Sequence, residues 1–264
     1  MIELYKGDCL EVNKNYNENC LDTMARMEDN FIDLTVTSPP YDNLRTYKGY
    51  SFDFESIAKE LFRVTKEGGV VVWVVGDATI KGSETGTSFK QALFFMECGF
   101  KLHDTMIYQK SVPPINSKRY QHNFEYMFVF VKGKIKTFNP IMVEKKYNDK
   151  RQNKKFHRNT DGVFVNGFSN SSKKLKLKEN VWKIWAAGGS SDKIASKHPA
   201  IFPEQLANDH IISWSNENDI VYDPFMGSGT TAKMAILNNR NWIGSEMSSE
   251  YCDIIKQRIN DKEG

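Results

Sequence analysis

Two polar turns, each following an apolar run, carry the residue types that could do chemistry. Ser38-Pro39-Pro40-Tyr41 follows the run 32–37, and its prolines end a strand without starting a helix. The turn would lie at the carboxyl edge of a sheet, where open α/β sheets bind ligands. Its hydroxyl and backbone carbonyls would be fixed hydrogen-bond acceptors, and its aromatic ring would be a stacking surface. That combination suits a planar group that carries an NH2, although Ser-Pro-Pro alone is also an ordinary turn sequence.

The second turn is rich in glycine. Residues 219–225 read as a buried strand, and Met226-Gly227-Ser228-Gly229-Thr230-Thr231 then leads into a helix. Glycines permit a tight turn close to a ligand, and a helix start presents free N–H groups. No Gly-Lys-Ser/Thr follows, so this is not a Walker loop. Glu246 ends the next strand about twenty residues later, where a ribose-binding carboxylate is expected. A dinucleotide would fit this half equally well, and Glu246 alone could be a solvated strand end.

The basic residues are concentrated in one part of the chain. The formal net charge is +3, but residues 132–183 hold fifteen Lys or Arg against four acids. The remainder holds 21 basic and 29 acidic residues. A run such as 173–178 is typical of a solvated face, but a basic half beside an acidic remainder indicates a polyanionic partner.

Helix and strand patterns alternate along the chain, which predicts a mainly parallel, doubly wound α/β sheet. The predicted strands are residues 2–5, 31–36, 70–75, 101–109 and 125–131, and the predicted helices are 10–27, 54–65 and 88–98. The Ser-Pro-Pro-Tyr turn lies near the N-terminus and the glycine turn near the C-terminus. We therefore expect the strand 2–5 to lie beside the strand 242–245.

Together, the two turns resemble the motifs of the S-adenosylmethionine-dependent DNA amino-methyltransferases, which modify N4 of cytosine or N6 of adenine. Their order is similar to the circularly permuted group, in which the catalytic motif comes first. Residues 5–10 resemble the family's first segment, 123–126 a target-pocket segment, and 197–203 the segment near the methionine end of the cofactor. The resemblance implies a Rossmann-like methyltransferase sheet that binds S-adenosylmethionine.

The resemblance also assigns roles to individual residues. The implied catalytic residues are Ser38, Pro39, Pro40 and Tyr41. The implied cofactor-binding residues are Asp8, Cys9, His198, Pro199, Phe202, Asp223, Pro224, Phe225, Gly227, Gly229, Thr230, Thr231 and Glu246. No metal ligands are expected, because the four cysteines show no Cys-x-x-Cys spacing.

The basic region matches no named family segment, so we expect an inserted target-recognition region. The predicted organisation is a methyltransferase domain of residues 1–133 and 197–264, with the insert at 134–196. The candidate DNA-binding residues are Lys118, Arg119, Lys145, Lys146, Lys150, Arg151, Lys154, Lys155 and Arg158. The expected partner is double-stranded DNA, with a homodimer and a cognate restriction enzyme as further candidates.

The residue types suit direct methyl transfer. The lone pair of an exocyclic amine is delocalised into the ring, and acceptors at the Ser38 hydroxyl and the Pro39 carbonyl would favour its pyramidalisation. A duplex base must first be flipped out, and Tyr41 would restore about 1–3 kcal/mol of stacking. Methylation of cytosine C5 typically requires a Pro-Cys pair, and no cysteine here follows a proline.

Within the family, Ser in the first motif position is commoner among N4-cytosine enzymes and Asp among N6-adenine enzymes. We therefore predict a site-specific DNA methyltransferase acting on N4 of cytosine, with N6 of adenine as the alternative. An RNA methyltransferase and a catalytically silent DNA-binding module are the other readings. We expect a cytoplasmic protein without a membrane partner, because no secretory signal and no apolar run near the ~20 residues of a membrane span is present.

Overall fold

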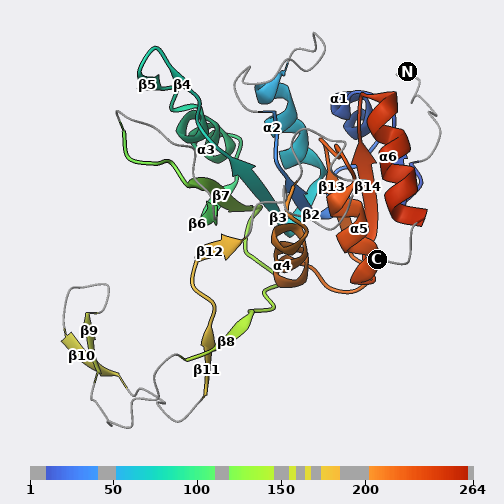
Figure 1. Ribbon diagram of the computed structural model, residues 1–264. Helices are drawn as coiled ribbons and strands as arrows, with labels where there is room; N and C mark the ends of the chain where they lie inside the picture. The colour runs from blue at the N-terminus through green and yellow to red at the C-terminus, as the bar shows by residue number, and fades with distance from the viewer. Residues whose placement is uncertain are drawn as a thin grey trace. The chain divides into compact units, whose positions relative to one another are not determined.

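A mixed sheet of eight strands organises the larger part of the molecule (Figure 1). The computed structural model describes residues 10–40, 52–110, 119–145, 155–158, 164–167, 174–184 and 202–260, of which 155–158 and 164–167 are described by their backbone alone. Within these ranges the strand order is β1-β14-β13-β2-β3-β7-β6-β12. In that order the strands are Lys14–Tyr16, Asn241–Ser245, Ile220–Asp223, Ile32–Thr37, Thr65–Val75, Phe124–Val131, Lys101–Lys110 and Val181–Ile184.

The strands that carry the two turns run parallel in the middle of the sheet. β14, β13, β2 and β3 pair parallel to one another, whereas β7 is antiparallel to both β3 and β6. β2 and the valine-rich second half of β3 are almost wholly buried, as expected of parallel strands covered on both faces. The prediction of a mainly parallel, doubly wound sheet is confirmed.

Helices cover both faces of the sheet, as alternate residues of β7 show. Phe128 and Phe130 belong to the core that holds Phe95. Met127 points the other way, where its sulfur lies 3.3 Å from His210 Nε2. The first face is covered by α1 (Cys20–Ala25), α2 (Phe54–Val64) and α3 (Thr87–Glu97), and α4 (Glu204–Trp214) covers the second. α5 (Thr230–Leu237) packs beside α4, and α6 (Ser249–Asn260) contacts α5.

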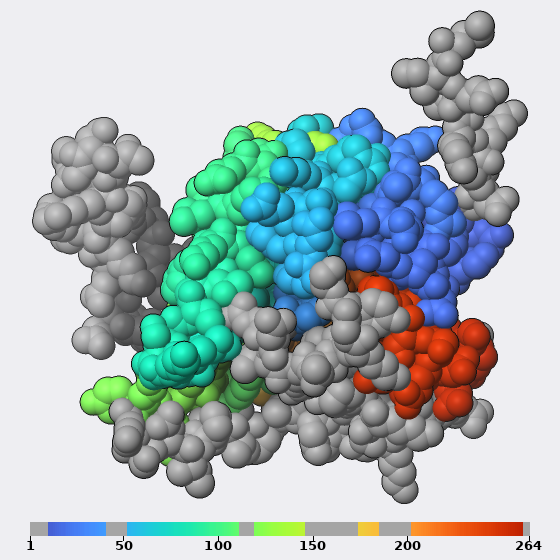
Figure 2. Space-filling model, turned by 90° about the horizontal axis from the view of Figure 1, so that it is seen from above, coloured from blue at the N-terminus to red at the C-terminus, as the bar shows by residue number. Residues whose placement is uncertain are grey.

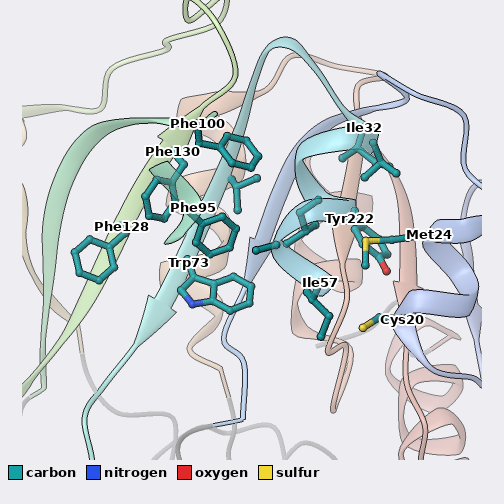
Figure 3. Packing of buried hydrophobic residues seen from close by; sticks show 14 of the residues in the cluster. Cys20, Met24, Ile32, Ile57, Trp73, Phe95, Phe100, Phe128, Phe130 and Tyr222 are labelled. Atoms are coloured by element: carbon teal, nitrogen blue, oxygen red, sulfur yellow. The ribbon is translucent and has the colours of Figure 1, made fainter. Parts of the chain in front are cut away.

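Aromatic rings fill the core between the sheet and the first three helices (Figure 3). Trp73 of β3 contacts Phe95 of α3 edge to face with a 5.0 Å centroid separation, and Phe95 stacks on Phe130 at 4.7 Å. The indole N–H of Trp73 donates to Gln91 Oε1 at 2.9 Å, so its polar atom is paired inside the core. These contacts hold α3 against the sheet.

The N-terminal part of the chain differs from the prediction. Residues 10–27 do not form one helix: β1 and α1 occupy this stretch, separated by an asparagine-rich turn in which Asn19 caps α1 by accepting from Leu21 N–H at 2.9 Å. β1 pairs with β14, the strand beside which residues 2–5 were expected. Residues 2–5 lie outside the described ranges. In Figure 2 the blue N-terminal and red C-terminal surfaces lie side by side, in agreement with this pairing.

The other predicted elements are confirmed with small changes at their ends. The expected helices 54–65 and 88–98 correspond to α2 and α3, and the expected strands correspond to β2, β3, β6 and β7. α2 begins after Asp53, whose carboxylate accepts from Ser56 N–H at 3.2 Å. A hydrogen-bonding side chain at this position typically stabilises the start of a helix.

Residues 140–179 form a second compact unit, separate from residues 1–139 and 180–264. In this unit β8 (Met142–Glu144) pairs with β11 (Leu175–Leu177), and β9 (Lys155–Arg158) pairs with β10 (Phe164–Gly167), both antiparallel. The unit lies inside the predicted insert of 134–196. The two ends of the predicted insert belong to the larger unit. β12 pairs in the large sheet, and the backbone N–H groups of Lys136 and Asn139 donate to the carbonyls of Gly68 and Ser213.

Among the described helices, none has the length and apolarity to span a bilayer.

We predict that Phe95→Ala lowers the free energy of unfolding by about 3–5 kcal/mol, because the ring is wholly buried among other aromatic rings. Phe89→Ala on the same helix is the matched control. Its ring is 51% exposed, and its loss should cost under about 1 kcal/mol. Urea unfolding of both variants measures the difference, and equal losses would show that the α3 interface is misassigned.

Candidate active site

The catalytic turn begins where β2 ends. β2 lies between β13 and β3, so its carboxyl end sits in the middle of the edge at which open α/β sheets bind ligands. Ser38 and Pro40 are half-buried and Pro39 is buried. Ser38 is therefore held on a stiff backbone and is partly accessible. Tyr41, the fourth predicted catalytic residue, lies outside the described ranges.

The glycine turn lies at the carboxyl end of the neighbouring strand β13. Gly227 and Gly229 have φ angles of 53° and 81°, which disfavour residues with a side chain. A Cβ added at Gly229 would also lie 3.1 Å from Ile255 Cγ1. Gly229 caps α5 and its N–H donates to the Met226 carbonyl at 2.8 Å. The first turn of α5 therefore presents its N–H groups at the same edge as Ser38.

The carboxylate of Asp223 joins the two turns. Oδ1 accepts from Thr37 Oγ1 at 2.6 Å and from the Phe225 N–H at 3.0 Å, and Oδ2 accepts from Thr231 Oγ1 at 2.7 Å. Asp223 is buried, and burial raises the pKa of its carboxyl, although the hydrogen bonds from Thr37 and Thr231 oppose the rise. Asp223 was predicted to bind the cofactor, but in the structure its carboxylate accepts hydrogen bonds from within the protein.

Glu246 holds the other side of the glycine turn. Its Oε2 accepts from the Gly227 N–H at 2.9 Å, and its Oε1 accepts from the Ser248 N–H at 2.8 Å. Burial raises the pKa of this carboxyl, and the two backbone bonds oppose that rise. A carboxylate has about four acceptor positions, so Glu246 has capacity for two hydroxyl donors.

These features fit the nucleoside part of S-adenosylmethionine. A ribose diol can donate to Glu246 at the end of β14, and the glycine turn of β13 allows close backbone approach. Ser38 at the end of β2 is then the next group along the edge, on the side where a methyl group would be delivered. The residues present are therefore suited to the cofactor that the sequence predicts.

Some residues that support this site were missed by the sequence analysis. Asn17 Nδ2 donates to the carbonyls of Glu246 and Met247 at 2.8 and 3.0 Å, and the Glu246 N–H donates to the Tyr16 carbonyl at 3.0 Å. A signal for this segment exists: Tyr16-x-x-Asn19-Cys20-Leu21 repeats the pattern Tyr5-x-x-Asp8-Cys9-Leu10 eleven residues later. The second copy begins in β1, beside β14, and residues 5–9 of the first copy lie outside the described ranges.

The structure places the other predicted cofactor residues unevenly. Phe202 lies two residues before α4 and is half-buried, and Pro224 is buried beneath the glycine turn. The Phe225 ring contacts the rings of Phe52 and Trp73, at centroid distances of 5.6 and 6.2 Å. Thr230 and Thr231 are buried at the start of α5. Asp8, Cys9, His198 and Pro199 lie outside the described ranges.

The predicted DNA-binding residues lie in both units. Arg119 is paired with the β4–β5 hairpin (Thr79–Ile80 and Ser83–Glu84), where it donates to the Gly82 carbonyl and to Glu84 Oε1. Lys145 follows β8, and its backbone N–H donates to the Lys174 carbonyl at 2.9 Å. Lys155 and Arg158 belong to β9. The structure does not describe Lys118, Lys146, Lys150, Arg151 and Lys154.

The cysteines of the described ranges are not suited to nucleophilic attack. Cys20, Cys98 and Cys252 are free thiols. Burial raises the pKa of all three, that of Cys20 to about 12. Since the thiolate is the nucleophile, these three groups are held in their unreactive form, in line with transfer to an amine and not to a ring carbon.

The fold is that of an α/β enzyme, with a glycine turn suited to a nucleoside beside the Ser-Pro-Pro segment. Residues 32–257 match the family model of the N6/N4 methyltransferases, described as DNA methylase, and the chain belongs to this family. It is an S-adenosylmethionine-dependent DNA methyltransferase.

Curated relatives match most of the chain. It is 61% identical over 234 residues to the orphan methyltransferase M.BamHII of Bacillus amyloliquefaciens, covering 86% of this chain and 88% of that protein. It is 30% identical to the Type II methyltransferase M1.MboII of Moraxella bovis, covering 92% and 94%.

Solved structures share the fold. The cytosine-N4-specific PvuII DNA methyltransferase superposes with a TM-score of 0.73 at 20% identity, covering 97% of this chain and 89% of that one. The M1.HpyAVI complex with S-adenosylmethionine superposes with a TM-score of 0.62 at 25% identity, covering 94% and 98%. The predicted Rossmann-like methyltransferase fold is confirmed.

We predict that Thr37→Val lowers the free energy of unfolding by about 1.5–3 kcal/mol, because the buried Asp223 carboxylate loses a hydroxyl donor. It should also slow methyl transfer, since Thr37 directly precedes Ser38. Thr35→Val is the matched control on the same strand: among the described atoms its buried hydroxyl has no hydrogen-bond partner. The control should be neutral or slightly stabilising. Equal losses in urea unfolding would contradict the role of the Thr37–Asp223 bond.

Proposed function

We propose that the enzyme methylates N4 of cytosine in double-stranded DNA at a specific sequence. The observation that carries the proposal is Ser38, held at the end of β2 beside the glycine turn. Within the family that the sequence resembles, Ser in this position is commoner among N4-cytosine enzymes. The PvuII enzyme is named as cytosine-N4-specific, but at 20% identity its likeness speaks for the fold, so Ser38 carries the choice of base.

The amine chemistry follows from the acceptors at this edge. The Ser38 hydroxyl and the Pro39 carbonyl accept the two N–H bonds of the target amine, which localises its lone pair toward the incoming methyl group. Bound S-adenosylmethionine supplies that methyl group on a sulfonium. The proline pair keeps the acceptors in place, so most of the rate enhancement comes from positioning. The base enters after flipping out of the duplex, and Tyr41 provides its stacking surface.

N6 of adenine is the alternative acceptor. Adenine and cytosine both present an exocyclic amine next to a ring nitrogen, and the matched family covers both bases. The two products are distinct nucleosides, so the choice is open to direct measurement.

We further propose that the compact unit of residues 140–179 reads the DNA. It holds eleven Lys or Arg against four Asp or Glu, and a basic surface supplies the phosphate contacts that position a duplex. Its antiparallel pairs β8–β11 and β9–β10 are two-stranded ribbons, a kind of element that the major groove of DNA admits. The catalytic edge is common to the fold, so recognition of sequence falls to this unit.

The proposal extends to the enzyme's setting. Type II relatives fit an enzyme that acts beside a cognate restriction enzyme, and M.BamHII, named as an orphan, fits one that acts alone. A cytoplasmic location, where bacterial DNA is accessible, and a homodimer are the further parts of this proposal.

Incubation with plasmid DNA and labelled S-adenosylmethionine should yield N4-methylcytosine as the modified nucleoside, identified by mass spectrometry after digestion. Ser38→Ala should keep its affinity for S-adenosylhomocysteine and lose most transfer, because it removes only an acceptor of the target amine. Thr35→Val, the control on the same strand, should keep both. Recovery of N6-methyladenine would refute the base assignment and leave the enzyme class intact.

Lys145→Glu should weaken binding of duplex DNA and lower the slope of log affinity against log salt by about 0.9 for each phosphate that the variant no longer neutralises. Lys101→Glu is the control, since Lys101 is exposed at the start of β6, at the amino ends of the parallel strands. Affinity for S-adenosylhomocysteine should stay unchanged in both variants. The same loss of DNA affinity in both would contradict a role for the 140–179 unit.

A further inference from the structure

Arg258, two residues before the end of α6, is a buried arginine behind the glycine turn. Its side chain is 1% exposed. Nη1 donates to the Ser228 carbonyl at 2.6 Å, to Ser228 Oγ at 3.1 Å and to Thr230 Oγ1 at 3.1 Å. Nη2 donates to Glu204 Oε1 at 2.8 Å. One guanidinium thus connects the turn after β13 with the first residue of α4.

The position of this charge is unfavourable unless something compensates for it. A cation near the N-terminus of α5 opposes the helix dipole, and a buried charge requires a partner. Glu204 supplies the opposite charge, but its Oε1 also accepts from Lys233 Nζ at 2.9 Å. Arg258 and Lys233 thus both bond to the Glu204 carboxylate beside α5, whose first turn also donates to the buried Asp223 carboxylate through Thr231.

The order of the strands says which part of the cofactor meets this region. Glu246 at the end of β14 is suited to the ribose, and Ser38 at the end of β2 is where the methyl group is needed. Between them lies the turn of β13. The amino-acid part of S-adenosylmethionine carries a carboxylate, which suits the free N–H groups at the start of α5. Phe202, in the segment expected at the methionine end, lies two residues before Glu204.

We propose that Arg258 is a positioning residue for the amino-acid part of the cofactor. It fixes the backbone of the Ser228-Gly229-Thr230 turn from behind, and through Glu204 it fixes the start of α4 against the same turn. It acts through these groups and does not itself touch the cofactor. Arg258 lies one residue beyond the range matched by the family model. This role goes beyond the proposed function, since it does not depend on the target base or on DNA.

The test compares two ligands that differ only in the amino-acid part. S-adenosylhomocysteine contains it, and 5′-methylthioadenosine has a methyl group in its place. In Arg258→Met, calorimetry should show about tenfold weaker binding of S-adenosylhomocysteine, as expected when a charged hydrogen-bond donor to the turn is removed. Binding of 5′-methylthioadenosine should change little, because Glu246 still holds the nucleoside side. Arg258→Lys keeps the charge but not the forked donors and should show a smaller loss of the same kind.

Arg240→Met is the matched control. Arg240 also donates to backbone carbonyls, those of Ser215 at 2.7 Å and Asn238 at 2.5 Å, but it lies beyond the other end of α5. Its loss should lower stability without changing the ratio of the two affinities. Equal weakening of both ligands in the Arg258 variants, or no weakening, would overturn the proposal. If Arg258→Met fails to unfold cooperatively, the ratio measured in Arg258→Lys decides by the same criterion.

Discussion

The buried carboxylate of Asp223 is the interaction on which the geometry of the active site depends. Its oxygens accept hydrogen bonds from three segments. Thr37 donates from the end of β2, just before Ser38, and Thr231 donates from the first turn of α5. The Phe225 N–H donates from the start of the glycine turn. Thr231 Oγ1 also lies 3.3 Å from the Val36 carbonyl. A buried carboxylate is costly without such partners, so the two turns can separate only at the expense of an unpaired charge.

The parallel arrangement of β14, β13 and β2 explains why the hydrogen bonds of Asp223 matter for the site. Adjacent parallel strands end at the same edge, so Glu246, the glycine turn and Ser38 follow one another there. Each is fixed by different contacts. Glu246 accepts from backbone N–H groups, and the glycine turn is held by Asp223 and Arg258. Ser38 is held between Thr37, which bonds to Asp223, and the two prolines. Methyl transfer that relies on positioning requires such a line of fixed groups. The sheet supplies the order, and the buried polar contacts supply the precision.

The parts of the fold that could be predicted from the sequence are those specified by apolar patterns. Trp73 and its neighbouring valines read plainly as a buried strand, and Ile57, Leu61 and Val64 read as one face of a helix. The stretch 10–27 was mispredicted because its apolar residues have helical spacing, whereas Asn13 adopts a positive φ of 63° and Asn19 serves as a cap. Asparagine favours both conformations through its short polar side chain, a local preference that outweighed the pattern.

The positions of the two turns could be predicted from the sequence, but the directions of their side chains could not. The motifs located both turns, and the strand order confirms that they are neighbours. A motif cannot show that the carboxylate of Asp223 points inward, because that depends on hydroxyls supplied by Thr37, 186 residues away in sequence. The role of Arg258 could not be predicted from the sequence either, because an arginine near the end of an amphipathic helix usually interacts with solvent.

The separation of charge along the chain fits the two tasks proposed for the enzyme, which are cofactor binding and DNA recognition. At the edge where β13 and β14 end, the buried carboxylates of Asp223 and Glu246 organise the backbone of the glycine turn. A duplex needs cations, and cations close to these carboxylates would compete for their hydrogen bonds. Eleven of the basic residues lie in the 140–179 unit, which has its own strand pairs. With the proposed DNA contacts in a different unit from these carboxylates, DNA affinity would vary with salt, while the buried contacts that hold the glycine turn are screened far less.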